Sequence, residues 1–323
     1  MRCKRYEAWT KMISNVTRVA LRTVAAAILT SGVKSRGAFT LSELLAVVTI
    51  VAFLAAILFP VLERAGETVR TAQCLNNMKQ LQRCYRMYVE DNQGWLPWNG
   101  IGGIGGGVES WITNNNAQTT VVFNGIEAGV LYPYNRNVKI YQCPENVRTL
   151  PVPNGTEVAQ ARQEYDLPTI SFSSLLPQTR TCSINYPLGG YTGASAANGQ
   201  LDGAVLATGV QAVNKYSEMI APNPTPARMF VFVDENEYSV DDGDFAMYPA
   251  GSGENEWWNT PGSRHDRGTT WSFADGHCEY WKWHGTVVPT QEVNPYDGYT
   301  HYAPADSSDD LARVQAGTCP LGN

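Results

Sequence analysis

The sequence lacks the short cysteine motifs that mark zinc and redox sites. It has seven cysteines, but no two of them are spaced as Cys-x-x-Cys. It also lacks a basic strip interleaved with aromatic residues, so we expect no nucleic-acid partner. The glycine run 101–107 has no closing Lys-Ser/Thr, which excludes a phosphate-binding loop. Only 17% of the residues are charged and 43% are hydrophobic, which predicts a packed core and not a disordered chain.

The basic residues are concentrated at the N-terminus. Residues 1–38 contain eight Lys and Arg and a single acid, although the net charge of the whole chain is −6. A basic leader before an acidic body is typical of a targeting segment. We therefore predict that residues 1–38 form a cleaved leader that stays in the cytoplasm.

An apolar run of 21 residues, 39–59, follows this leader and contains one charge, Glu43. About 20 apolar residues span a bilayer as a helix. A signal peptide would have its small residues after the apolar run, whereas Gly37 and Ala38 precede it. This order predicts cleavage on the cytoplasmic side of the membrane, with the apolar helix kept in the mature protein.

The helical pattern continues beyond Pro60 as an amphipathic segment. Apolar residues recur at steps of three or four until the breakers Asn92, Gly94 and Pro97. We predict one helix over 39–90, kinked near Pro60 and about 75 Å long at about 1.5 Å per residue. The part 39–59 would serve for membrane insertion and assembly, and the part 60–90 would be amphipathic.

The segment Gly-Ala-Phe-Thr-Leu-Ser-Glu-Leu-Leu (37–45), with the apolar run and Pro60, resembles the N-terminal motif of type IV prepilins and type II secretion pseudopilins. The resemblance implies cleavage by a prepilin peptidase and methylation of the new N-terminus. Cleavage between Ala38 and Phe39 makes Glu43 the fifth mature residue and Pro60 the twenty-second, as in that family. The family usually has Gly before the cut, so cleavage after Gly37 stays open as the second choice. Independently of the resemblance, the charge of Glu43 inside a spanning helix needs a partner, and we expect the N-terminal amine of a neighbouring subunit to serve.

The body of the chain is similar to a planctomycete-type pilin-like family with a His-x9-Asp-Gly motif. The motif residues are His265, Asp275 and Gly276, and shorter segments at 129–134, 140–144, 181–186 and 233–235 accompany them. The roles of this family are largely unassigned, so the resemblance implies a fold and no activity.

These patterns predict an α+β, pilin-like fold, in which the long helix packs on an antiparallel sheet with large loop insertions. The head, residues 91–323, should contain strands at 138–142, 228–233, 269–274 and 277–283. The Asp275-Gly276 pair predicts a two-residue hairpin turn between the last two strands. Residues 145–220 should form long loops with little regular structure, and the tail from Pro289 should be polar and turn-rich.

Export of the head would favour disulfides among its cysteines. A bridge between Cys143 and Cys182 is the first candidate and one between Cys278 and Cys319 the second. The alternative is that these residues are buried free thiols. Cys74 and Cys84 lie ten residues apart on one helix and cannot bridge to each other.

Other candidate site residues have structural interpretations. His265 and Asp275 lack a neighbouring nucleophile or a second clustered histidine, so we expect Asp275 to shape the turn and His265 or Arg264 to bond the backbone. Calcium ligands at Asp234, Asp242 and Asp244 are an alternative, although the spacing is not that of a calcium loop. We expect the dense tryptophans to pack against the long helix, and a sugar-binding platform is the second interpretation. Their positions are 257, 258, 271, 281 and 283.

The sequence therefore predicts a structural subunit and not an enzyme, with no cofactor. Its expected partners are copies of itself, the prepilin peptidase, the inner-membrane assembly machinery and lipid before assembly. Its expected location is the bacterial inner membrane and then a periplasmic or extracellular filament, either a pilus or a secretion pseudopilus. The alternative function is a membrane-anchored binding or adhesion module that uses the tryptophan-rich head.

Overall fold

The computed structural model describes residues 41–99, 110–113, 123–152, 174–189, 213–220, 224–240, 243–248, 250, 255–285, 303–304 and 308–318. The chain forms two compact units, Met1–Thr68 and Val69–Asn323. Helix α2 (Leu41–Asp91) contributes to both. We call its part up to Thr68 the apolar segment and the second unit the head. The predicted cleavage residues Gly37, Ala38 and Phe39 lie outside the described residues.

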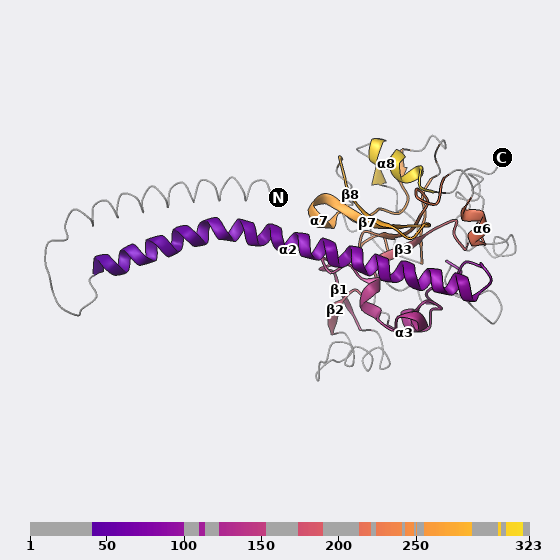
Figure 1. Cartoon of the computed structure of the whole chain (residues 1–323), viewed down its shortest axis with the longest axis horizontal. Helices are drawn as coiled ribbons and strands as arrows, with labels where there is room; N and C mark the ends of the chain where they lie inside the picture. The colour runs from indigo at the N-terminus through magenta and orange to yellow at the C-terminus, as the bar shows by residue number, and fades with distance from the viewer. Residues whose placement is uncertain are drawn as a thin grey trace. The chain divides into compact units, whose positions relative to one another are not determined.

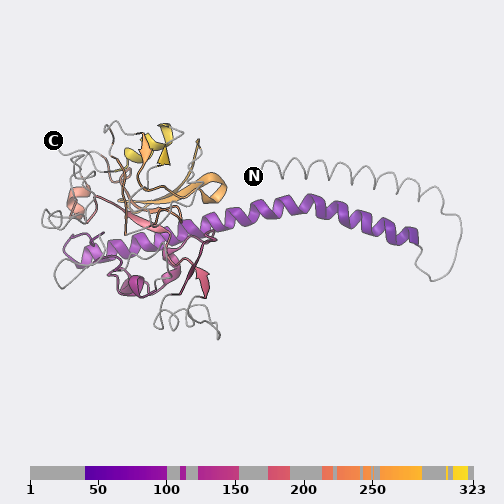
Figure 2. The same cartoon turned by 180° about the vertical axis from the view of Figure 1, so that it is seen from behind.

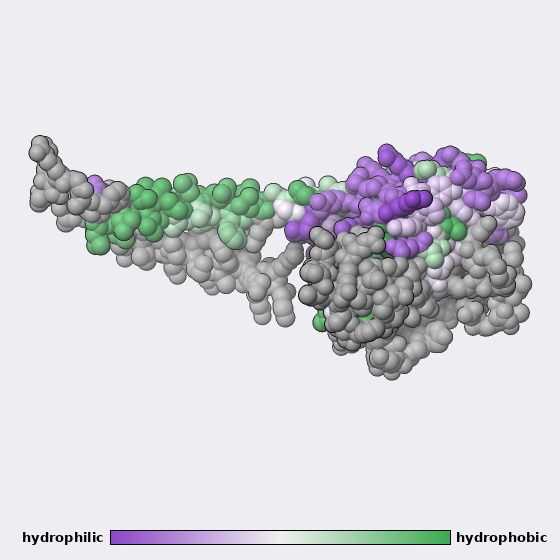
Figure 3. All heavy atoms as spheres, turned by 90° about the horizontal axis from the view of Figure 1, so that it is seen from below, coloured by the Kyte–Doolittle hydropathy of each residue, from purple (hydrophilic) through white to green (hydrophobic). Residues whose placement is uncertain are grey.

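The apolar segment exposes hydrophobic side chains on every side of the helix. Helix α2 continues through Pro60 without interruption. Fourteen large hydrophobic residues between Leu41 and Leu62 have exposures of 44–86%, and Figure 3 shows the apolar surface that they form. Among the described residues, α2 is the one helix long and apolar enough to cross a membrane. A membrane span or a signal is therefore supported by its length and composition.

A five-stranded sheet forms the centre of the head and confirms the predicted α+β class. Its strand order is β5-β3-β4-β7-β8, and all neighbours are antiparallel except β3 and β5. The strands are β3 (Cys182–Asn185), β4 (Phe230–Asp234), β5 (Asp244–Phe245), β7 (Gly268–Phe273) and β8 (Cys278–Lys282). Two small sheets pair β1 (Thr149–Pro151) with β2 (Leu175–Pro177) and β6 (Glu256–Trp257) with β9 (Ala303–Pro304).

Six short helices complete the described part of the head. They are α3 (Asn124–Glu127), η2 (Tyr132–Tyr134), η3 (Val138–Tyr141), α6 (Tyr216–Met219), α7 (Arg264–Arg267) and α8 (Ser308–Gln315). Figures 1 and 2 show α2 and α8 on opposite sides of the β7–β8 hairpin. The sheet is thus covered by a helix on each face, which gives the head two hydrophobic layers.

One layer lies between α2 and the sheet. The buried positions of α2 begin at Cys74 and recur at Met78, Leu81, Tyr85 and Tyr88, at steps of four and three. The Tyr85 ring packs edge-on against Phe232 of β4, with ring centroids 5.7 Å apart. In the same layer, the Gln82 amide donates to the Phe273 carbonyl at 2.9 Å. The part of α2 from Cys74 onward is therefore a core element of the head, whereas Leu62 and Val69 in the same predicted amphipathic part are exposed.

Four of the five tryptophans singled out above fill the second layer, on the face of the sheet away from α2, and Trp258 lies in a separate small cluster. Trp271, Trp281 and Trp283 cluster with Leu311 and Val314 of α8. The prediction of core packing is confirmed, but the prediction that the tryptophans pack against the long helix is wrong. The reason is the alternation of β7: Thr270 and Ser272 face Cys74 and Gln82 of α2, so Trp271 between them faces the other side of the sheet.

The predicted strands 228–233, 269–274 and 277–283 correspond to β4, β7 and β8, and the hairpin between the last two is confirmed. Its loop has three residues and not two, because the Phe273 amide donates to the His277 carbonyl. Gly276 occupies the position with φ of +98° that such a loop requires.

Three local predictions are wrong. Residues 138–142 form the 3-10 helix η3 and not a strand, because the Asn137 side chain accepts from the Lys139 amide at 3.0 Å and caps the turn. Residues 145–220 contain strands β1, β2 and β3, and β3 is central to the sheet. The tail contains α8, whose apolar side chains close the tryptophan layer.

Candidate functional site

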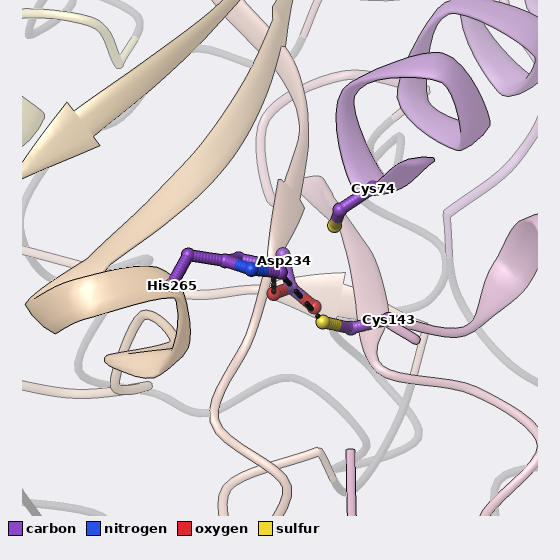
Figure 4. A group of neighbouring side chains, drawn as sticks. All are labelled: Cys74, Cys143, Asp234 and His265. Carbon is purple, nitrogen blue, oxygen red and sulfur yellow. Dashed lines mark hydrogen bonds and ion pairs between the residues drawn. The ribbon is translucent and has the colours of Figure 1, made fainter. Parts of the chain in front are cut away.

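Four metal-ligating side chains from four separate segments converge inside the head. Cys74 lies on α2, Cys143 follows η3, Asp234 ends β4 and His265 lies on α7 (Figure 4). Their ligand atoms lie within 4.8 Å of one another, and all four residues are buried. Within the described ranges, no other group of three or more His, Cys, Asp or Glu side chains is this close. We call these residues the CCDH cluster.

Two of these side chains, Cys74 and Asp234, are fixed by hydroxyl groups in and beside the sheet. The Cys74 sulfur lies 3.1 Å from the Thr270 hydroxyl of β7. The Thr181 hydroxyl donates to Asp234 Oδ1 at 2.7 Å and accepts from the Cys143 amide at 2.8 Å. Since Thr181 immediately precedes β3, one hydroxyl group connects the sheet to the loop that carries Cys143.

The backbone around His265 is in the left-handed region, which is uncommon for residues other than glycine. The φ angles of His265, Asp266 and Arg267 are +57°, +56° and +67°. The His265 amide donates to Glu145 Oε2 at 2.7 Å, and its carbonyl accepts from the Tyr280 hydroxyl at 2.6 Å. These contacts hold the strained turn in place.

The imidazole of His265 has a distinct neighbour at each nitrogen. Nδ1 lies 3.1 Å from Glu145 Oε2, and Nε2 lies 3.1 Å from the Cys143 sulfur. Glu145 is in turn held by Arg70 of α2, whose Nε lies 2.8 Å from Glu145 Oε1. Glu145 thus holds the backbone amide of His265, its carboxylate lies beside Nδ1 without a hydrogen bond to it, and Nε2 faces the cluster.

Arg264 supplies the positive charge beside Asp234. Its guanidinium lies 2.7 Å from Asp234 Oδ1, donates to the Glu235 carbonyl at 2.6 Å and also pairs with Glu237. The second oxygen, Asp234 Oδ2, accepts no hydrogen bond from the described residues although it is fully buried. It lies 4.0 Å from His265 Nε2. A buried carboxylate oxygen without a donor is costly, and this one faces the cluster.

The environment shifts the pKa values of all four groups. Burial raises the pKa of Asp234 to about 7, against the opposing charge of Arg264. The pKa of Cys74 is raised by its hydrogen bond to Cys143 and by burial. Burial acts to raise the pKa of Cys143, but hydrogen bonds from Cys74 and His265 and the charge of Arg264 bring it well below its usual value. Burial acts to lower the pKa of His265, and the contact with Cys143 raises it.

Two kinds of chemistry use a cysteine, a histidine and a carboxylate in this arrangement. In a nucleophilic enzyme the imidazole activates the thiol and the carboxylate orients the imidazole. Such a thiol must meet a substrate, but Cys143 and His265 are each only 2% exposed. Metal coordination has no such requirement and uses all four groups, including Cys74 and the orphan oxygen of Asp234.

The sequence motif His-x9-Asp-Gly does not bring its own residues together into one site. Asp275 lies in the β7–β8 turn, where its side chain accepts from the His277 amide at 3.1 Å, so its predicted turn role is confirmed. The predicted hydrogen bond of Arg264 to the backbone is also confirmed, because its guanidinium donates to the Glu235 carbonyl. The prediction that His265 has no nucleophile beside it is wrong, because chain folding places Cys143 there.

The predicted disulfide between Cys143 and Cys182 is wrong. All five described cysteines are free thiols, including Cys278, Cys74 and Cys84. The Cys143 sulfur faces His265, whereas the Cys182 thiol donates to the Tyr141 carbonyl at 3.2 Å. The alternative of buried thiols therefore holds for this pair. Cys319, the predicted partner of Cys278, lies outside the described residues.

The calcium candidates do not form an oxygen cage. Asp234 faces sulfur and imidazole ligands, which calcium does not favour. Asp244 is buried on β5, and Asp242 lies outside the described residues. The assembly residue Glu43 is exposed in the first turn of α2.

Comparison with known proteins gives no family: the chain matches no family model, no curated protein and no solved structure. The architecture itself is consistent with a pilin, since a long N-terminal apolar helix continues into the core of a head built on a mixed β-sheet.

Proposed function

We propose that this chain is a pilin-like structural subunit that assembles with copies of itself through the apolar segment. The observation that carries the proposal is the exposure of fourteen large hydrophobic side chains on all sides of α2. Burial of one such side chain contributes about 1.5–3 kcal/mol, so an uncovered segment is strongly unfavourable in water. A helix that is apolar all round needs lipid or other helices around it.

Processing at the start of this helix fits the proposed assembly. Removal of residues 1–38 by a prepilin peptidase would leave Phe39 as a methylated N-terminus, with Glu43 as the fifth residue. A carboxylate among packed apolar helices requires a partner. The terminal amine of a neighbouring subunit provides one, and the pair would set the register between helices.

The product would be a pilus-like filament or a secretion pseudopilus, reached from an inner-membrane precursor. The alternative of a tryptophan-based binding head loses its support, because the five tryptophans it requires have exposures of 7% or less. A structural role needs no catalytic group, in agreement with the burial of Cys143 and His265.

Mass spectrometry of the mature N-terminus tests the processing step. The full chain would be produced in bacteria with and without a prepilin peptidase. We expect peptidase-dependent loss of residues 1–38 and a methylated Phe39. Cleavage after the apolar segment, or an intact leader in the presence of the peptidase, would contradict the proposal.

Replacement of Glu43 by alanine tests the assembly step. We expect Glu43→Ala to reach the membrane at the normal level but to yield few or no sheared filaments, because its pairing charge is lost. Glu90→Ala is the matched control, since Glu90 lies on the same helix in an exposed pair with Arg86 at 3.9 Å. Normal filament yield from Glu43→Ala would show that the pairing role is wrong.

A further inference from the structure

We propose that the CCDH cluster is a structural zinc site, in which Cys74, Cys143, Asp234 and His265 coordinate one zinc ion. Structural zinc sites are four-coordinate and tetrahedral, with ligands from thiolate, imidazole and carboxylate groups. The cluster offers one ligand atom from each of four buried side chains, all within 4.8 Å of one another.

The separations between the ligand atoms suit a tetrahedral ion. Zinc bonds of about 2.3 Å to sulfur and 2.0 Å to nitrogen or oxygen place neighbouring ligand atoms about 3.3–3.8 Å apart. Two separations in the cluster are 3.1 Å, from Cys143 Sγ to His265 Nε2, and 4.0 Å, from His265 Nε2 to Asp234 Oδ2. Side-chain shifts below about 1 Å would complete the geometry.

Two features of the cluster are explained by a metal. Asp234 Oδ2 is buried without a donor, although Oδ1 of the same carboxylate has two. His265 Nε2 faces the cluster, 3.1 Å from Cys143 Sγ, and the other ring nitrogen, Nδ1, lies 3.1 Å from Glu145 Oε2. A carboxylate at the second nitrogen of a zinc-bound histidine is a common arrangement, because it fixes the ring and increases its basicity.

The charges also fit a dication. Two thiolates and one carboxylate carry a charge of −3, which a zinc ion reduces to −1. Arg264 lies beside Asp234 and opposes the remaining charge. The pair of soft thiolates favours zinc over magnesium or calcium. A disulfide between Cys74 and Cys143 would explain neither the unbonded oxygen of Asp234 nor the position of His265 Nε2 beside the Cys143 sulfur.

The test uses the full chain, purified in detergent under reducing conditions, treated with a chelator and then loaded with zinc. We expect one tightly bound zinc per chain by elemental analysis. X-ray absorption of the wild-type protein should show two sulfur ligands at about 2.3 Å and two nitrogen or oxygen ligands at about 2.0 Å. Cobalt in place of zinc should give the visible absorption of a tetrahedral thiolate complex.

Variants then assign the ligands. Cys143→Ser and His265→Gln should weaken zinc binding more than about 100-fold, and Glu145→Gln, which changes the group behind the ligand, by about 10–100-fold. Cys84→Ser and Cys182→Ser are matched controls, because both remove a buried thiol outside the cluster. The near-ultraviolet circular dichroism of the buried tryptophans shows whether each variant is folded.

Some results would overturn the proposal. They are the absence of zinc binding by the folded wild-type chain, a different ligand set in the absorption spectrum, or a Cys74–Cys143 disulfide in the protein isolated from cells. Because the wild-type spectrum alone reports the kinds and number of the ligand atoms, a variant that fails to fold does not decide the outcome. The filament assay of Glu43→Ala is independent of this site.

Discussion

Replacement of Leu81 by alanine tests whether the C-terminal part of α2 belongs to the core of the head. Leu81 is fully buried in the layer that α2 shares with the sheet. A buried Leu→Ala change removes its packing and leaves a cavity, which costs about 2–5 kcal/mol. A loss of about 3 kcal/mol lowers the melting temperature of a domain of this size by about 6–12 °C.

The assay is thermal unfolding of the full chain in detergent, followed by near-ultraviolet circular dichroism of the tryptophan layer. Leu62→Ala is the matched control, because it makes the same change in the same helix at a residue that is 58% exposed. We expect it to change the free energy of unfolding of the head by less than about 0.5 kcal/mol. An equal or larger effect of Leu62→Ala would refute the division of α2 into an exposed part and a core part.

Further substitutions test the sheet and the buried charges by the same unfolding measurement. Gly268→Ala should cost more than about 2 kcal/mol, because its Cβ would lie 2.4 Å from both a backbone carbonyl oxygen and a tyrosine ring of β8. Gly276→Ala, where the added methyl meets open space at φ of +98°, should cost about 1 kcal/mol. Arg264→Met should cost about 3–5 kcal/mol because it leaves the charge of Asp234 buried and unpaired. Lys282→Met, which breaks an exposed ion pair, should cost less than about 1 kcal/mol; similar losses for the two cation variants would contradict the burial argument.

The long helix and the C-terminal strands could be predicted from the sequence because their signals are local. Apolar side chains at steps of three and four define the buried face of α2, and β4, β7 and β8 are rich in aromatic and β-branched residues. Strand β3 has no such signal: all four of its residues are buried, including Ser183 and Asn185. Its polar side chains bond to partners distant in the sequence: the Asn185 side-chain amide donates to the Phe230 carbonyl at 2.9 Å, and the Ser183 hydroxyl donates to Glu235. The hydrophobic pattern of a short segment cannot show hydrogen-bond partners that lie far away in the sequence.

The CCDH cluster could not be predicted because its ligands are far apart in the sequence. His265 reaches it only through the left-handed turn of α7, and Cys143 only through the short helix η3. One signal was present: Cys74 lies on the same helical face as Met78 and Leu81, which placed a thiol toward the core. The motif that includes His265 marked one ligand but gave no indication of the other three.

The position of Cys74 on α2 gives the proposed zinc site a mechanical consequence. Cys74 is the first buried residue of α2 within the head, so separation of the helix from the sheet would begin there. Among the described cysteines no disulfide holds this end of the interface. A zinc ion would bind α2 to the η3 loop, β4 and α7 at once, and its binding free energy would add to the free energy needed to detach the helix. In the filament proposed above, tension along the helices would act on this edge of the interface first, so a zinc ion at Cys74 would resist detachment more than a zinc ion near Tyr88, at the other end of the helix.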